Sequence, residues 1–166
     1  MRAFLCLAAY SGFRCKEIAG LRREDVIDRN RTPLLRVSSG KGGHQAILPL
    51  NPATLEALRL YGMPSRGFVF TKADTMPLKP ATVSKLGNAY LHDIGIASTM
   101  HQLRHWFGTA VWSLTKDMRV TQEMMRHSHP GTTAGYAAFD PVLAAQAVTH
   151  VHELRRLPGA TVAEAT

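Results

Sequence analysis

Residues 99–110, "TMHQLRHWFGTA", carry a clear helical pattern. At about 100° of rotation per residue, an α-helix here places His101, Arg104 and His105 on one face. The Ser-Thr pair at 98–99 is suited to cap the start of this helix. The pattern predicts a helix that presents a cationic cluster on one side and packs into the core on the other. The core-facing residues are Leu103, Trp106, Phe107 and Ala110.

The rest of the chain predicts a mainly α fold with a small antiparallel β-sheet, in the α+β class. The strand-like runs "PLLRVSS" (33–39) and "HQAILPL" (44–50) flank "GKGG" at 40–43, which indicates a β-hairpin with a glycine-rich turn. Residues 22–32 are interpreted as a polar link. The other expected helices lie at about residues 2–10, 15–21, 52–61, 80–92, 117–125 and 141–156, with a short helical segment around Tyr136.

Composition indicates one basic domain. The chain has 166 residues, a formal net charge of +8 and a pI near 10.0, and a compact domain this basic usually meets a polyanion. Nucleic acid is the first expectation and an acidic membrane surface the second, while a merely solvated cationic surface stays open. No apolar run approaches the ~18–20 residues of a membrane span, and Cys6 and Cys15 match no disulfide or metal framework, as in a cytoplasmic protein.

Two other kinds of site fit the sequence poorly. "HQLRH" has the i, i+4 histidine spacing of a helical zinc site, but Gln102 stands where a zinc protease has its glutamate, and Arg104 would lie between the ligands. The "GKGG" turn lacks the further glycine and the Ser or Thr of a phosphate-binding P-loop. We therefore expect no metal and no nucleotide cofactor.

Several positions are suited to binding an anion. Arg14 stands at the start of a helix with Glu17 one turn later, so the carboxylate can orient the guanidinium toward phosphate oxygens. Lys41 lies at the glycine-rich hairpin tip, His127 at a helix end, and Tyr136 nine residues beyond it. Taken singly, each could be an ordinary ion pair, turn lysine, capping histidine or half-buried tyrosine.

Together, four motifs carry a resemblance. In order, "SGFRCKE", "GKGGHQAILPL", "HQLRH" and "MMRHSHPGTTAGY" resemble the catalytic motifs of the tyrosine recombinase (phage integrase) family. The resemblance runs from about residue 5 to 150. It implies the catalytic-domain fold of DNA breaking-rejoining enzymes. It also implies site-specific DNA recombination through a covalent 3′-phosphotyrosyl intermediate, without metal or ATP.

The resemblance also implies roles for the reacting groups. Tyr136 matches the nucleophile that attacks the scissile phosphate. Arg14 and Arg104 match the family's two arginines, which stabilise charge on the non-bridging oxygens in the transition state. Lys41 matches the hairpin lysine that protonates the leaving 5′-oxygen.

Four further positions are expected to assist. His101 and His127 match positions that the family uses to bind phosphate and assist proton transfer. Glu17 is expected to orient Arg14, and His105 to support its own helix.

The chain departs from the family pattern in three places. Arg126 stands where the family usually has glycine before the histidine of the last motif, so it alters the helix exit or adds a phosphate contact. Gln45 and Ala46 stand where the hairpin strand usually carries basic residues. Residues 1–156 look like a catalytic domain alone, without the N-terminal DNA-clamping domain and at least one preceding helix, and residues 157–166 like a disordered tail. We therefore expect weak, salt-sensitive DNA binding.

The expected partners are double-stranded DNA and other protomers in a DNA-bound tetramer, with a host DNA-bending factor as an accessory. The expected location is the bacterial cytoplasm, at the nucleoid, in a protein of phage or mobile-element origin. The last helix packs either within its own domain or onto a neighbouring protomer. Two alternatives stay open for the function: DNA relaxation of the type IB topoisomerase kind, and a non-catalytic DNA-binding module.

Overall fold

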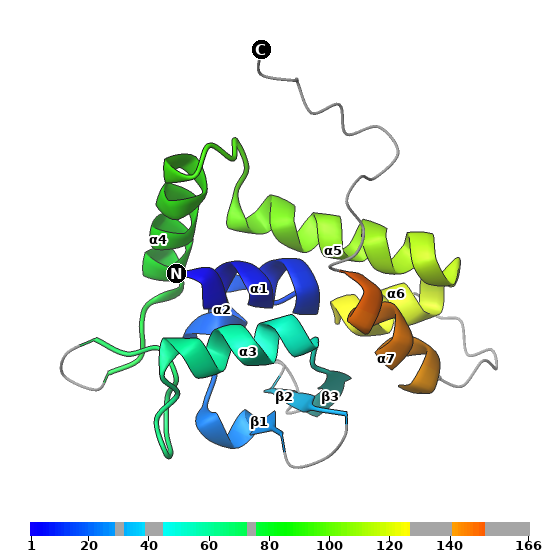
Figure 1. Ribbon diagram of the computed structural model, residues 1–166, viewed down its shortest axis with the longest axis horizontal. Coiled ribbons are helices and arrows are strands. Elements are labelled where there is room, and N and C mark those ends of the chain that lie inside the picture. The colour runs from blue at the N-terminus through cyan, green and yellow to red at the C-terminus, as the bar shows by residue number, and fades with distance from the viewer. Residues whose placement is uncertain (29–31, 39–44, 73–75, 127–140, 152–166) are drawn as a thin grey trace.

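The computed structural model describes residues 1–28, 32–38, 45–72, 76–126 and 141–151. It is mainly helical with one small antiparallel sheet, which confirms the expected fold class (Figure 1). The elements are α1 (Arg2–Ser11), α2 (Cys15–Ala19), the 3-10 turn η1 (Arg23–Asp25), β1 (Val26–Ile27), β2 (Leu34–Ser38), β3 (Gln45–Pro49), α3 (Pro52–Tyr61), α4 (Pro80–Asp93), α5 (Met100–Thr115), α6 (Met118–Met125) and α7 (Pro141–His150).

Helix α1 forms the centre of the core. It lies between α3 and α5 and packs against both (Figure 1), and its residues Leu7 and Ala8 are completely buried. The helix ends at Gly12, whose left-handed backbone (φ 61°) is the conformation that glycine adopts at least cost. A side chain at Gly12 would place Cβ 2.4 Å from the ring of Phe107, so the turn after α1 rests directly on α5.

Helix α5 begins where the sequence predicts. Thr99 Oγ1 accepts from the backbone N–H of Gln102 at 3.2 Å, and Gln102 Oε1 accepts from the N–H of Thr99 at 2.8 Å. The expected exposed face of α5 is wrong in one respect. His101 and His105 are exposed, but Arg104 is only 5% exposed and lies on the buried side of the helix, with Phe107.

The sheet has one strand more than the sequence predicts. β2 and β3 pair antiparallel from Leu34 opposite Pro49 to Ser38 opposite Gln45, as expected for the hairpin. β1, which lies inside the expected polar link, pairs with β2 through Val26 and Leu35. A strand of two residues is too short for alternation to reveal it, and the buried Val26 (3% exposed) holds it in place by packing.

Helix α6 begins at the expected cap, because Asp117 Oδ1 accepts from the N–H groups of Arg119 and Val120 at 2.7 and 3.1 Å. Helix α7 packs against α5 and β3 of its own domain. Among the residues whose burial is described, Ala144, Ala147 and Val148 of α7 are buried, as is Val151 just after it. The sequence predicts that Val142, Ala145, Val148 and Leu154 share one apolar side of this helix. Val148 is buried, but Val142 is 64% exposed, so the predicted buried side is wrong at Val142.

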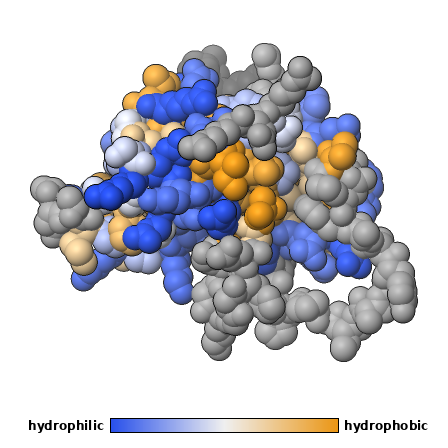
Figure 2. Space-filling model, turned by 90° about the horizontal axis from the view of Figure 1, so that it is seen from below, coloured by the Kyte–Doolittle hydropathy of each residue, from blue (hydrophilic) through white to orange (hydrophobic). Residues whose placement is uncertain are grey.

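An apolar groove lies beside α7. Figure 2 shows hydrophobic residues gathered on the face of the molecule that carries the sheet. The groove has a volume of about 670 Å³ and is lined by β2, β3 and α7, with Leu34, Ile47 and Ala145 among its lining residues. Among the described helices, none is long and apolar enough to cross a membrane.

Candidate functional site

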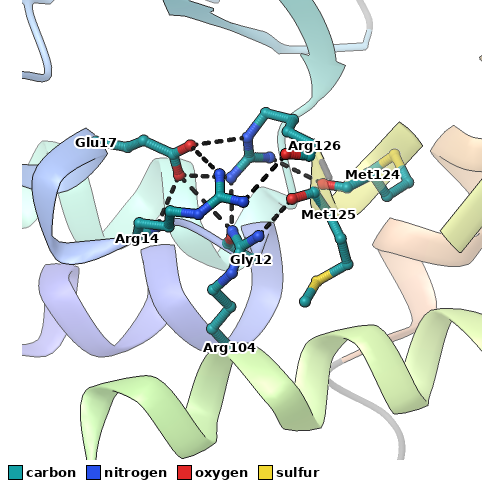
Figure 3. Close-up of polar contacts among 7 residues, drawn as sticks. All are labelled: Gly12, Arg14, Glu17, Arg104, Met124, Met125 and Arg126. Atoms are coloured by element: carbon teal, nitrogen blue, oxygen red, sulfur yellow. Dashed lines mark hydrogen bonds and ion pairs between the residues drawn. The ribbon is translucent and has the colours of Figure 1, made fainter. Parts of the chain in front are cut away.

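The candidate site forms where the turn after α1, the start of α2, the middle of α5 and the end of α6 meet (Figure 3). Arg14 immediately precedes α2, and its backbone N–H donates to Glu17 Oε2 at 2.7 Å. The Arg14 side chain donates from Nη1 to Glu17 Oε1 at 2.9 Å. The two residues are three positions apart, so one helical turn is enough to orient this guanidinium.

Arg104 reaches the same place from α5. It donates from Nη1 to the carbonyl oxygen of Gly12 and from Nη2 to that of Met125 (Figure 3). Its Nη1 also lies 3.8 Å from Glu17 Oε2. The burial of Arg104 is therefore compensated by backbone carbonyls at two helix ends, as a buried charge requires.

Arg126 is a third arginine of the cluster. It donates to Glu17 from Nη2 at 2.7 Å and from Nε at 3.2 Å, and also to the carbonyl oxygens of Gly12 at 2.8 Å and Met124 at 2.9 Å. Its guanidinium lies 4.9 Å from the centre of the Phe13 ring. The sequence predicts an altered helix exit or a phosphate contact here. The backbone is left-handed at Arg126 (φ 51°), and the side chain points inward to Glu17.

The three guanidiniums differ in exposure. The Arg14 side chain is 42% exposed, whereas those of Arg104 and Arg126 are 6% and 4% exposed. The only carboxylate in this group of contacts is Glu17, so the cluster carries two positive charges in excess. Of the three guanidiniums, that of Arg14 is therefore the one accessible to an anion from solvent, and those of Arg104 and Arg126 are buried.

Burial and neighbouring charges shift the pKa values of both Glu17 and Arg104. Burial raises the pKa of Glu17, but the hydrogen bond and ion pair with Arg126, and then the contacts with Arg14, bring its pKa below the ordinary value of 4.5. Burial and the charges of Arg126 and Arg14 lower the pKa of Arg104 to about 10, while Glu17 raises it. Glu17 and Arg104 are therefore both ionised at neutral pH.

The exposed histidines of α5 form a pair of their own. The Nε2 atoms of His101 and His105 lie 2.8 Å apart, and the rings meet edge to face at 88°. At that distance the N–H of one ring donates a hydrogen bond to the ring nitrogen of the other. Over the described ranges, no hydrogen bond joins His101 to the three arginines, and no group of three His, Cys, Asp or Glu side chains could hold a metal ion.

The structure brings together Arg14, Glu17 and Arg104 of the residues expected from the sequence. Lys41, His127 and Tyr136 lie outside the described residues, as does the short helical segment expected around Tyr136. The roles of the Gly12 and Met125 carbonyl oxygens could not be predicted from the sequence, because no pattern of side chains indicates which backbone carbonyls accept hydrogen bonds. Arg126 is recognisable in the sequence as a departure from a motif, but nothing in the sequence indicates its ion pair with Glu17.

A helical domain that gathers three guanidiniums around one carboxylate is suited to bind a phosphodiester. The chain belongs to the phage integrase family, whose profile matches residues 1–141. Its relatives include the tyrosine recombinase XerC of Mesorhizobium japonicum, 34% identical over 148 residues, which are 83% of this chain and 46% of that protein. XerA of Pyrococcus horikoshii is 30% identical over 148 residues, covering 81% of this chain and 49% of the relative.

Solved structures agree with this family. The integrase of mycobacterium phage Brujita superposes with a TM-score of 0.74 at 33% identity, covering 93% of this chain and 53% of that one. A XerA recombinase gives a TM-score of 0.66 at 25% identity, covering 89% of this chain and 51% of that one. The chain thus spans about half the length of the proteins that it matches.

Proposed function

We propose that this protein cleaves and rejoins DNA strands as a site-specific tyrosine recombinase. The observation that carries the proposal is that Arg104 of α5 meets Arg14 and Glu17 at the start of α2, with the Arg14 side chain 42% exposed and that of Arg104 buried. The relatives are named recombinases, which favours strand exchange over relaxation of supercoils.

The chemistry requires stabilisation of charge on a phosphate. Tyr136 Oη gives up its proton, with His101 or His127 as the acceptor, and bonds to the scissile phosphorus. The bond from phosphorus to the 5′-oxygen breaks, and Lys41 protonates that oxygen. Arg14 and Arg104 stabilise the negative charge that gathers on the non-bridging oxygens. His101 and His127 assist in binding the phosphate and moving protons. These roles of Lys41, His101, His127 and Tyr136 rest on the resemblance of their motifs to the family.

The partners in this proposal are double-stranded DNA and further copies of the protein on the recombination site. A host DNA-bending factor is an additional partner where the site must be folded. The reaction takes place at the DNA of a bacterial cell, hence in its cytoplasm. Integration of a phage or mobile element is the biological role that agrees with the Brujita integrase.

The test is formation of a covalent adduct on a nicked, radiolabelled duplex with a candidate attachment site. We expect an adduct that survives denaturation, forms in the presence of EDTA and is absent from the Tyr136→Phe variant. Because a buried guanidinium aimed at transition-state charge contributes about a hundredfold or more to rate, Arg104→Lys should lower adduct formation to that extent.

The outcomes separate the candidate functions. Tyr136-dependent adducts with religation to a second duplex support recombination. DNA binding without any adduct would support the non-catalytic DNA-binding module and contradict the proposal.

A further inference from the structure

We infer that Arg126 is the counter-ion of Glu17, a positioning residue that leaves the charges of Arg14 and Arg104 available to the DNA phosphate. The inference rests on the proposed function and adds to it a residue that the family's motif does not require. It concerns a position where the motif that this chain resembles usually has glycine.

The distances identify which arginine neutralises the carboxylate. Arg126 reaches both oxygens of Glu17 with its side chain, at 2.7 and 3.2 Å. The Arg14 side chain reaches a single oxygen, at 2.9 Å, and Arg104 approaches no closer than 3.8 Å. A two-point contact between a guanidinium and a carboxylate is the strongest geometry for such a pair.

Burial shows that Arg126 acts through Glu17 and does not face an incoming ligand. Its side chain is 4% exposed, and its remaining donors are directed to the carbonyl oxygens of Gly12 and Met124. The Arg14 side chain, ten times more exposed at 42%, contacts the same carboxylate and donates from Nη2 to the carbonyl oxygen of Arg126 at 3.1 Å (Figure 3). The donors of the Arg126 side chain are therefore committed to Glu17 and to backbone carbonyl oxygens, whereas the Arg14 side chain is the exposed one.

The charge balance gives this arrangement its effect. With Arg126 in place, three guanidiniums face one carboxylate, and the excess charge is +2. Without it, Glu17 would draw on Arg14 and Arg104, and the excess would fall to +1. A phosphate then competes with Glu17 for the same two cations, in an environment where burial strengthens each interaction.

The experiment compares single-turnover adduct formation on the nicked duplex for the wild type, Arg126→Gln, Arg126→Lys and the double variant Glu17→Gln/Arg126→Gln. We expect Arg126→Gln to react about tenfold more slowly than wild type, because one unit of charge is lost close to the phosphate. Arg126→Lys, which keeps the charge but not the fork, should be slowed less. The double variant restores the excess charge of +2 and should regain most of the rate.

A purely structural role for Arg126 predicts a different result. If Arg126 only anchors the end of α6, the double variant loses the same anchor and reacts no faster than Arg126→Gln. A double variant that reacts no faster than Arg126→Gln would overturn the inference. So would a double variant that does not fold, or an Arg126→Gln variant that reacts within about twofold of the wild-type rate. Thermal unfolding of each variant identifies those that are folded, and if Arg126→Gln is not, the rate of the folded double variant decides.

The proposed function can fail separately. If the wild type forms no Tyr136-dependent adduct, the proposed function is wrong and the inference falls with it. If the wild type reacts and Arg126→Gln reacts equally fast, only the inference is wrong.

Discussion

Gly12 contributes both to the packing of the core and to the binding of two arginines. Its left-handed backbone lets α1 end directly against Phe107, and its carbonyl oxygen accepts from both Arg104 and Arg126. The packing of the core and the placement of the cationic cluster therefore depend on the same peptide unit.

Replacing Gly12 by alanine should consequently be costly. The left-handed conformation costs roughly 1 kcal/mol for a residue with Cβ, and the contact 2.4 Å from Phe107 adds about 1–3 kcal/mol of overpacking. We expect Gly12→Ala to lower the free energy of unfolding by about 2–4 kcal/mol in urea titrations.

Gly62→Ala is the matched control. Gly62 also has a left-handed backbone (φ 89°), but a side chain there would meet nothing within 4 Å. It should cost roughly the 1 kcal/mol of backbone strain alone. Equal losses for the two variants would show that Phe107 gives way and that the turn does not rest on α5 as described.

At the scale of elements, two helices end in an unusual way. Both α5 and α6 end at a residue other than glycine in the left-handed region, Lys116 (φ 53°) and Arg126 (φ 51°). Lys116 is exposed and has its Nζ 4.5 Å from the Trp112 ring, whereas the Arg126 side chain is buried against Glu17. The same backbone strain is thus offset by very different side-chain contacts.

This contrast predicts opposite effects of glycine at the two helix ends. Lys116→Gly should be neutral or stabilising by up to about 1 kcal/mol, since it relieves strain and loses only an exposed cation–π contact. Arg126→Gly relieves the same strain but should destabilise by about 3 kcal/mol, because it breaks a buried ion pair. Denaturant unfolding of both variants measures the difference, and a stabilising Arg126→Gly would contradict the importance of the pair.

Most of the helices could be predicted from the sequence, because apolar periodicity and caps such as Thr99 and Asp117 are local signals. The burial of Arg104 could not, because it depends on acceptors that belong to α1 and α6. Likewise, β1 exists only through its pairing with β2, and the buried face of α7 was mistaken because α7 packs on two elements, α5 and β3. Each of these three features depends on contacts between segments that are distant in the sequence.

At the scale of the whole molecule, the formal charge of +8 should dominate DNA affinity. We expect the logarithm of the association constant to fall linearly with the logarithm of the salt concentration, by about 0.9 for each phosphate contacted. Arg14→Ala should make this slope shallower by about 1, since it removes one contact.

Arg59→Ala serves as the control for salt dependence. Arg59 is a 59% exposed arginine of α3 that lies outside the cluster of Arg14, Arg104 and Arg126, and its Nη2 lies 3.5 Å from Asp28, which Arg23 also contacts at 3.2 Å. The slope should be unchanged in this variant. Equal slopes for wild type and Arg14→Ala would remove Arg14 from the DNA contacts.

The pair between Glu17 and Arg126 joins positions 109 apart in the chain. During synthesis, Glu17 leaves the ribosome long before Arg126 has been added, and closing so long a loop is among the slower steps of folding. A nascent or interrupted chain that lacks α6 therefore has Arg14 and Glu17 but no complete cluster. The three guanidiniums therefore meet around Glu17 only once the fold has closed, so a partly synthesised chain lacks the anion-binding cluster on which the proposed function depends.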